Sequence, residues 1–160
     1  MARLSIPRGH QRRTLLRAGL ALLLTKLSRA RAAEGPPPPP FRLVVHPSFP
    51  ERAVERYFLA DAFLKKTTRW PNGELIRPAD LKATSPVRKV FSERVLKRSV
   101  GAVRSYWQQR IFSGRDVPPP ELDGDAEVIA FVAKHPGGVG YVSGAATLTG
   151  VKELSIAGGS

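Results

Sequence analysis

The 160-residue chain contains no cysteine, and its apolar runs are short. The lack of cysteine excludes disulfides, thiolate zinc sites, iron–sulfur ligation and a cysteine nucleophile. No apolar run approaches the roughly 20 residues that a membrane-spanning helix needs, so the sequence predicts no transmembrane segment in the mature chain. The length and a hydrophobic content of 42% fit one globular domain with a basic extension.

Acidic residues are absent from the first 32 positions, and this changes the meaning of the formal net charge of +13. Residues 1–32 contain eight basic residues and therefore contribute +8. The rest of the chain has 18 basic and 13 acidic residues, which leaves only +5. Because most of the excess charge lies in one short segment, the composition gives nucleic-acid binding little support, and we expect no nucleic-acid partner.

The basic segment has the order of an export signal. The adjacent Arg12 and Arg13 precede a short apolar stretch at residues 14–24, and Ala-Arg-Ala ends the segment at Ala32. This order predicts a signal peptide over residues 1–32, with arginines placed as in the twin-arginine type, and therefore a periplasmic location. An Arg-rich mitochondrial presequence and an uncleaved basic tail are the alternatives.

Proline and glycine mark the boundaries of the remaining chain. Residues 33–40 include five consecutive prolines and predict a stiff polyproline II linker. Residues 41–157 then alternate between strand and helix patterns, and residues 158–160 form a short Gly-Gly-Ser tail that we expect to be flexible. Alternating patterns predict one compact α/β domain, in which a small mixed or parallel sheet is flanked by about four helices.

The apolar patterns predict the main elements. Strands are expected at residues 43–45, 75–77, 139–142 and 154–156, and the first of these, a continuous apolar run, favours a buried strand of the parallel kind. Helices are expected from residue 51, after Ser85, after Ser99 and after residues 123–125, which supply aspartate caps. We expect Trp70 to pack against the sheet. The expected core faces of the first and third helices are Val54, Tyr57, Phe58 and Ala62, and Val103, Tyr106, Trp107 and Ile111.

Few residues suit catalysis or metal binding. The mature chain has two histidines, His46 and His135, and their contexts differ: His46 ends a strand, whereas His135 ends a helix. No serine lies in a Gly-x-Ser-x-Gly elbow, so nucleophilic catalysis has no support. We therefore expect a non-enzymatic protein with no catalytic residue, metal or cofactor. His46 is the better candidate for a ligand contact, because the carboxyl ends of strands face the ligand crevice in α/β sheets.

The glycine-rich run at residues 137–140 follows a helical pattern and precedes a strand. A phosphate-binding glycine loop needs the opposite order, strand first and helix second. These glycines are therefore predicted to end the helix and to let the strand start close to its neighbours.

The start of the helix at Ser85 is the best candidate for a binding site. Unpaired backbone N–H groups and the positive end of the helix dipole favour an anion there. Thr84 and Ser85 add hydroxyl groups, and Arg88 and Lys82 add positive charge. The alternative is that the Ser85 hydroxyl only caps its own helix, with Pro86 at the first helical position.

Three motifs resemble those of the periplasmic phosphate-binding proteins of ABC transporters. Residues 57–73 are similar to the stretch "IFLGKxTxWxDG" of that family, and residues 85–91 fall at the place of its "SGTRxxF" phosphate loop. Residues 133–142 match its "PGAIGYV" helix–turn–strand. The order and spacing of the three agree over residues 41–156, nearly the whole predicted domain.

This resemblance implies an exported type II periplasmic binding fold with a role in solute uptake, a small phosphate-like oxyanion as ligand, and transporter or envelope proteins as partners. The ligand residues it implies are Thr84, Ser85 and Arg88. However, Pro86 and Val87 stand where the family has glycine and a hydroxyl donor, and the chain is less than half the length of a two-lobed receptor. The alternative function is therefore a protein–protein interaction module of the cell envelope that has lost ligand binding.

Overall fold

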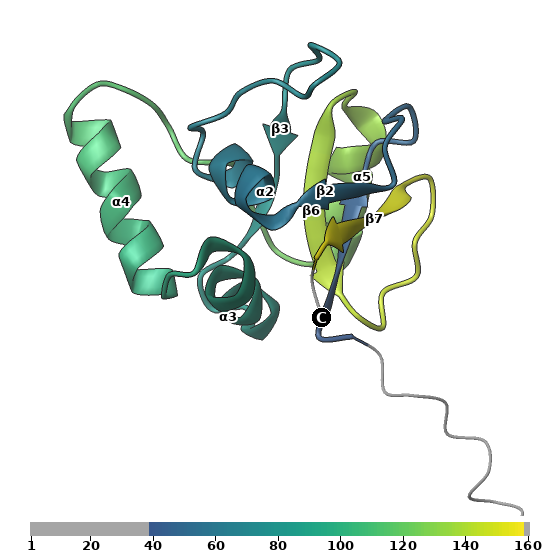
Figure 1. The fold of residues 1–160 in the computed structure, drawn as a ribbon. Helices are drawn as coiled ribbons and strands as arrows, with labels where there is room; N and C mark the ends of the chain where they lie inside the picture. The colour runs from purple at the N-terminus through teal and green to yellow at the C-terminus, as the bar shows by residue number, and fades with distance from the viewer. Residues whose placement is uncertain (1–38, 159–160) are drawn as a thin grey trace, which may run out of the picture. The chain divides into compact units, whose positions relative to one another are not determined.

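The computed structural model describes residues 39–158, and a five-stranded sheet lies at the centre of this part (Figure 1). The order of its strands is β2-β7-β1-β6-β3. The central strand β1 is antiparallel to both β6 and β7, whereas β2 is parallel to β7 and β3 is parallel to β6. The strands of this mixed sheet are β1 (Phe41–Val45), β2 (Ala53–Glu55), β3 (Arg77–Pro78), β6 (Gly138–Ser143) and β7 (Lys152–Ala157).

Helices and a second, two-stranded sheet complete the domain. The short strands β4 (Asp80–Leu81) and β5 (Glu121–Leu122) pair with each other in parallel. The helices are α2 (Arg56–Phe63), α3 (Pro86–Phe91), the π-helix η1 (Ser92–Leu96), α4 (Val100–Phe112) and α5 (Asp125–Lys134). The prediction of an α/β domain with a small mixed sheet and about four helices is therefore confirmed.

Helices cover both faces of the sheet at β6. Gly140 and Tyr141 are neighbours on this strand and point to opposite faces. On one face α5 lies so close that a Cβ at Gly140 would come within 2.6 Å of Val128 Cγ1. On the other face the ring of Phe91 stacks on Tyr141 with 3.8 Å between centroids. Burial on both faces explains the continuous apolar run of β1. The prediction that β1 is a parallel strand was wrong, because both of its partners run antiparallel to it.

The first helix begins later than the apolar spacing indicates. Residues 53–55 pair with β7 as strand β2, so α2 begins only at Arg56. Tyr57, expected in the core, is 62% exposed, because α2 buries the side that carries Leu59, Ala62 and Phe63, and this corrects that prediction. Trp70 lies in the core as expected, where its indole N–H donates to the Gly137 carbonyl over 3.0 Å. The core side chains of α2 are Leu59, Ala60, Ala62 and Phe63.

The caps of the middle helices follow the sequence, whereas their far ends do not. Ser85 and Ser99 are the N-caps of α3 and α4, as predicted. Ile111, expected in the core, is 50% exposed, because the last turn of α4 extends beyond its packing partners. The aspartate cap expected for the fourth helix is also wrong. Gly124 is the N-cap of α5, and the Asp125 carboxylate instead accepts a hydrogen bond from the Ser143 N–H over 2.9 Å.

The glycine run at residues 137–140 ends α5 and starts β6, as predicted. Gly137 has a φ of +74°, and a Cβ there would lie 2.0 Å from the Leu75 carbonyl oxygen. No helix within residues 39–158 is long and apolar enough to cross a membrane. The predicted signal peptide over residues 1–32 lies outside the described part of the chain, and so does most of the predicted linker.

Candidate functional site

The turn before α3 holds two of the three residues predicted to bind an anion. Thr84 is exposed and Ser85 is half-buried. The Ser85 hydroxyl accepts a hydrogen bond from the Arg88 N–H at 3.4 Å, and the Ser85 N–H donates to the Lys82 carbonyl over 2.9 Å. Pro86, the first residue of the helix, has no N–H. The turn therefore has few free donors, and the Ser85 oxygen already serves its own helix.

Arg88, the predicted countercharge, points away from this turn into the interior. Its side chain is only 4% exposed and lies between two carboxylates. Nη2 lies 3.1 Å from Asp80 Oδ2, and Nη1 lies 2.7 Å from Glu121 Oε1. Nη1 also donates to the carbonyl oxygen of Leu81. The guanidinium therefore joins α3 to the β4–β5 pair, because all three of its acceptors lie on those strands.

Asp80 is the buried partner in this cluster, and it is 5% exposed. The Tyr141 hydroxyl donates to its carboxylate, and the Leu81 N–H donates to Oδ1 over 2.9 Å. Burial raises the pKa of the Asp80 carboxyl, against the opposing effect of Arg88. Burial together with the neighbouring Asp80 charge also raises the pKa of Tyr141. With one guanidinium between two carboxylates, the cluster carries no excess positive charge that attracts an anion.

Lys82, the other cation near the turn, is also paired. Its ammonium group forms an ion pair with Asp123, and both side chains are exposed. The hydrogen bond from Lys82 to Asp123 raises the pKa of the lysine. Because the Lys82 ammonium group already pairs with Asp123, it is not a free countercharge for an oxyanion at Ser85.

The two histidines serve local structure. His46 Nδ1 lies 2.7 Å from the Ser48 hydroxyl, and the His46 N–H donates to the Gly138 carbonyl over 3.0 Å. His135 Nδ1 lies 2.7 Å from the Phe131 carbonyl oxygen, one turn earlier on α5. Within residues 39–158, no group of three or more histidine, aspartate or glutamate side chains is placed to hold a metal ion.

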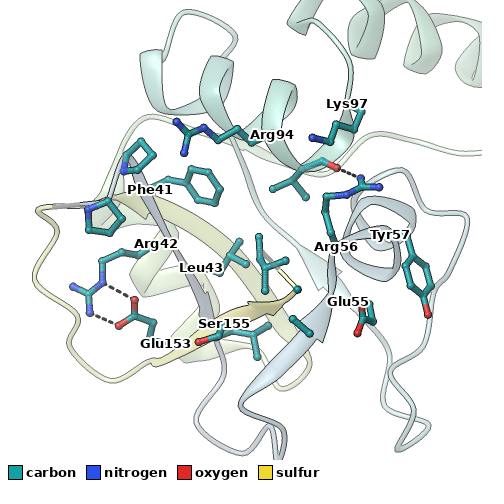
Figure 2. A pocket seen from close by; sticks show the side chains of 17 residues that line it. Phe41, Arg42, Leu43, Glu55, Arg56, Tyr57, Arg94, Lys97, Glu153 and Ser155 are labelled. Atoms are coloured by element: carbon teal, nitrogen blue, oxygen red, sulfur yellow. Dashed lines mark hydrogen bonds and ion pairs between the residues drawn. The ribbon is translucent and has the colours of Figure 1, made fainter. Parts of the chain in front are cut away.

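A surface groove of about 1060 Å³, which sequence reasoning missed, lies elsewhere, where η1 faces the β1 and β7 strands (Figure 2). Its apolar lining comes from three elements that are far apart in the sequence, so no local pattern indicates it. The main apolar residues are Phe41, Leu43, Val95, Leu154 and Ile156. The charged residues around them are Arg42, Glu55, Arg56, Arg94, Lys97 and Glu153.

Two of these arginines are engaged, and two other cations are not. Arg42 Nε lies 3.0 Å from Glu153 Oε1, and Arg56 Nη1 donates to the Val95 carbonyl over 2.7 Å. Arg94 and Lys97 are exposed and have no ion-pair partner within residues 39–158. Figure 2 shows both on the η1 side of the groove. The groove therefore combines an apolar floor with a cationic edge.

The π-helix sets this edge of the groove. Helix α3 widens at Ser92 into η1, which ends at Leu96, and the C-cap Lys97 has a φ of +55°, unusual for a residue with a side chain. The last carbonyl groups of a helix have no partner within it, and the Val95 carbonyl accepts a hydrogen bond from Arg56 instead. Such widened turns are often found at functional sites.

The mixed sheet with helices on both faces has the fold of part of a type II periplasmic binding protein. Three solved structures carry this likeness. An ABC-type phosphate transport receptor from Vibrio cholerae superposes with a TM-score of 0.58 at 16% identity, over 75% of this chain and 47% of the receptor. A putative phosphate ABC transporter substrate-binding protein with bound phosphate from Clostridium perfringens gives 0.59 at 18% identity, over 75% and 46% of the two chains.

The third structure is PstS from Borrelia burgdorferi, with a TM-score of 0.56 at 11% identity, over 75% of this chain and 48% of that protein. The chain thus spans about half the length of the receptors it resembles. No family model matches the sequence, and no curated protein matches it. The fold implied by the three sequence motifs is confirmed. Two of the three structures are described as a transport receptor and a substrate-binding protein.

Proposed function

We propose that this protein is an exported, non-catalytic envelope protein that uses part of the phosphate-receptor fold as an interaction module. The observation that carries the proposal is the position of Arg88. Its guanidinium is buried between Asp80 and Glu121 and is not available to a ligand at Ser85. The fold supports a binding role, and transporter or envelope proteins are the partners that suit it.

Weak binding of a phosphate-like oxyanion by Thr84, Ser85 and Arg88 is the second candidate function. It is favoured by the exposed Thr84 hydroxyl beside the Ser85 cap and by the likeness to a receptor described with bound phosphate. An anion taken out of water needs most of its acceptor sites filled by donors. The turn offers few, because Pro86 has no N–H and the Ser85 N–H is already bonded. We therefore rank this candidate second.

Titration with phosphate and sulfate separates the two candidates. We expect no saturable heat in calorimetry and no shift of the melting temperature of the purified protein, because an anion that does not bind the folded state cannot stabilise it.

Replacing the cap, Ser85→Ala, should cost about 1 kcal/mol of unfolding free energy. The matched variant Ser99→Ala, at the cap of α4, should cost a similar amount. Saturable binding that Ser85→Ala abolishes and Ser99→Ala leaves intact would support the oxyanion candidate and contradict the first.

The groove is the surface on which we expect a protein partner to bind, since its apolar floor and unpaired cations suit a partner with apolar and acidic side chains. In affinity capture from an envelope extract, the double variant Arg94→Glu/Lys97→Glu should lose the partner. The double variant Arg77→Glu/Lys134→Glu changes two exposed residues outside the groove, makes the same change in net charge, and should retain the partner. Equal recovery of the partner by both variants would exclude the groove as its binding surface.

A further inference from the structure

A second surface, at the C-terminal end of α4, differs from the groove and lies apart from the Ser85 turn. α4 is the helix farthest from the sheet in Figure 1. It is held by Val103 and Trp107, which are buried, and by the Tyr106 hydroxyl, which donates to the Leu64 carbonyl over 2.8 Å. In the loop after α4, the Asp116 carboxylate forms an ion pair with Lys65, with 3.6 Å between Oδ1 and Nζ. The C-terminal end of α4 therefore protrudes, while the helix and its loop are fixed to the rest of the domain.

Apolar side chains are exposed at this protruding end. Phe112 is 91% exposed, Ile111 is 50% exposed, and Val117 in the adjoining loop is 63% exposed. One exposed apolar side chain is ordinary on a protein surface. Here, however, three of the five large apolar side chains exposed within residues 39–158 fall within seven positions. Such clustering marks an interaction surface.

Positive charge surrounds these apolar side chains. Residues 98–117 contain four basic residues and one acidic residue, a net charge of +3. Residues 39–158 as a whole have 18 basic and 12 acidic residues, or +6, so this short segment holds half of the excess. Helical spacing places Arg104 and Ile111 on one side of α4, and Arg115 follows three residues after the end of the helix. Arg104 and Arg115 are exposed and have no ion-pair partner in the described part of the chain.

From this combination we infer that the end of α4 docks on an anionic lipid bilayer, with Phe112, Ile111 and Val117 entering the interface and the arginines facing the headgroups. A convex apolar tip with flanking arginines suits a fluid bilayer, which yields around it. A second copy of the same chain would bring two +3 segments together, so like charge opposes pairing through this surface. The inference does not depend on the proposed function, because it uses neither the groove nor the Ser85 turn.

Because the chain has no cysteine, a single introduced cysteine can carry a label that reports on this surface alone, even in the full chain with its basic residues 1–32. A single cysteine at Ser113→Cys, next to Phe112, carries an environment-sensitive fluorophore. The control label is at Thr149→Cys, which is exposed in the loop between β6 and β7, and Figure 1 shows that loop on the other side of the sheet from α4. The probes are vesicles of phosphatidylcholine alone and vesicles of phosphatidylcholine with phosphatidylglycerol in equal parts.

We expect a blue shift of the label at position 113 with the phosphatidylglycerol vesicles only, and none at position 149. Adding Phe112→Ser to the labelled chain should weaken this response about tenfold or more, because burial of the phenyl ring is lost. Arg104→Gln/Arg115→Gln should weaken it too, as should added salt. Leu75→Ser, which removes an apolar side chain 45% exposed elsewhere, should leave it unchanged.

Three results would overturn the inference. The first is no shift at position 113, or equal shifts at positions 113 and 149. The second is binding of soluble polyglutamate at position 113 without a response to vesicles, which would assign the surface to an acidic protein. The third is self-association in sedimentation that Phe112→Ser abolishes, which would assign it to a second copy.

Discussion

Replacing Gly137 with alanine should lower the free energy of unfolding by about 3 kcal/mol or more. Two effects add at this position. The φ of +74° is costly for any residue with a Cβ, and that Cβ would lie 2.0 Å from the Leu75 carbonyl oxygen. The backbone of residue 75 has little room to move, because the neighbouring Ile76 and Trp70 are buried. Urea denaturation of the purified protein measures the loss.

Gly73 offers a matched control for this prediction. It also has a positive φ, +86°, but a Cβ there would meet no atom within 4 Å. Gly73→Ala should therefore cost only the conformational part, about 1 kcal/mol. Equal losses in the two variants would show that the close approach to Leu75 contributes nothing, and would contradict our account of the glycine run.

The features that were predictable from sequence are local. Ser85 followed by Pro86 marks a helix start within a few residues, and the glycines at 137 and 138 mark a helix end in the same way. The strand β1 could be placed but not oriented, because its partners β6 and β7 lie about a hundred residues away. The pairing of residues 53–55 with β7 is also a long-range event, and for this reason the local spacing places the start of α2 too early.

The candidate site also combines local features, which were predictable, with long-range ones, which were not. The Ser85 cap follows from its neighbours in the sequence and was predicted. The ion pairs of Arg88 do not follow from its neighbours in the sequence. Asp80 precedes Arg88 and Glu121 follows it, on two strands that only tertiary folding brings together. A local pattern shows an arginine near a helix start and gives no sign of its acceptors. The sequence does place Asp80 between two apolar residues, Ala79 and Leu81, and a carboxylate buried by such neighbours needs a cationic partner.

Replacing Arg88 with methionine should lower the free energy of unfolding by about 3 to 5 kcal/mol, because it leaves the Asp80 carboxylate buried without its counterion. Glu121→Gln is the matched control. It removes the other carboxylate of the cluster, whose side chain is 47% exposed, so the loss should be about 1 kcal/mol or less. The double variant Arg88→Met/Asp80→Asn should recover part of the loss, since the amide is neutral and its oxygen still accepts from Tyr141. No recovery would show that packing, rather than charge, accounts for the effect.

The loss in Arg88→Met should also depend on pH. Burial raises the pKa of Asp80 in the folded protein above its unfolded value, while Arg88 lowers it, so removing Arg88 raises that pKa further. A carboxyl with a raised folded pKa binds its proton more tightly in the folded state. Its contribution to stability is therefore present below the unfolded pKa and is lost as the pH rises through the folded pKa. The deficit of Arg88→Met relative to the native protein should be largest near neutral pH and should shrink as the pH falls through the raised pKa of Asp80 in the folded variant. Denaturation curves over this range measure it, and a deficit independent of pH would mean that the Asp80 charge is not the cause.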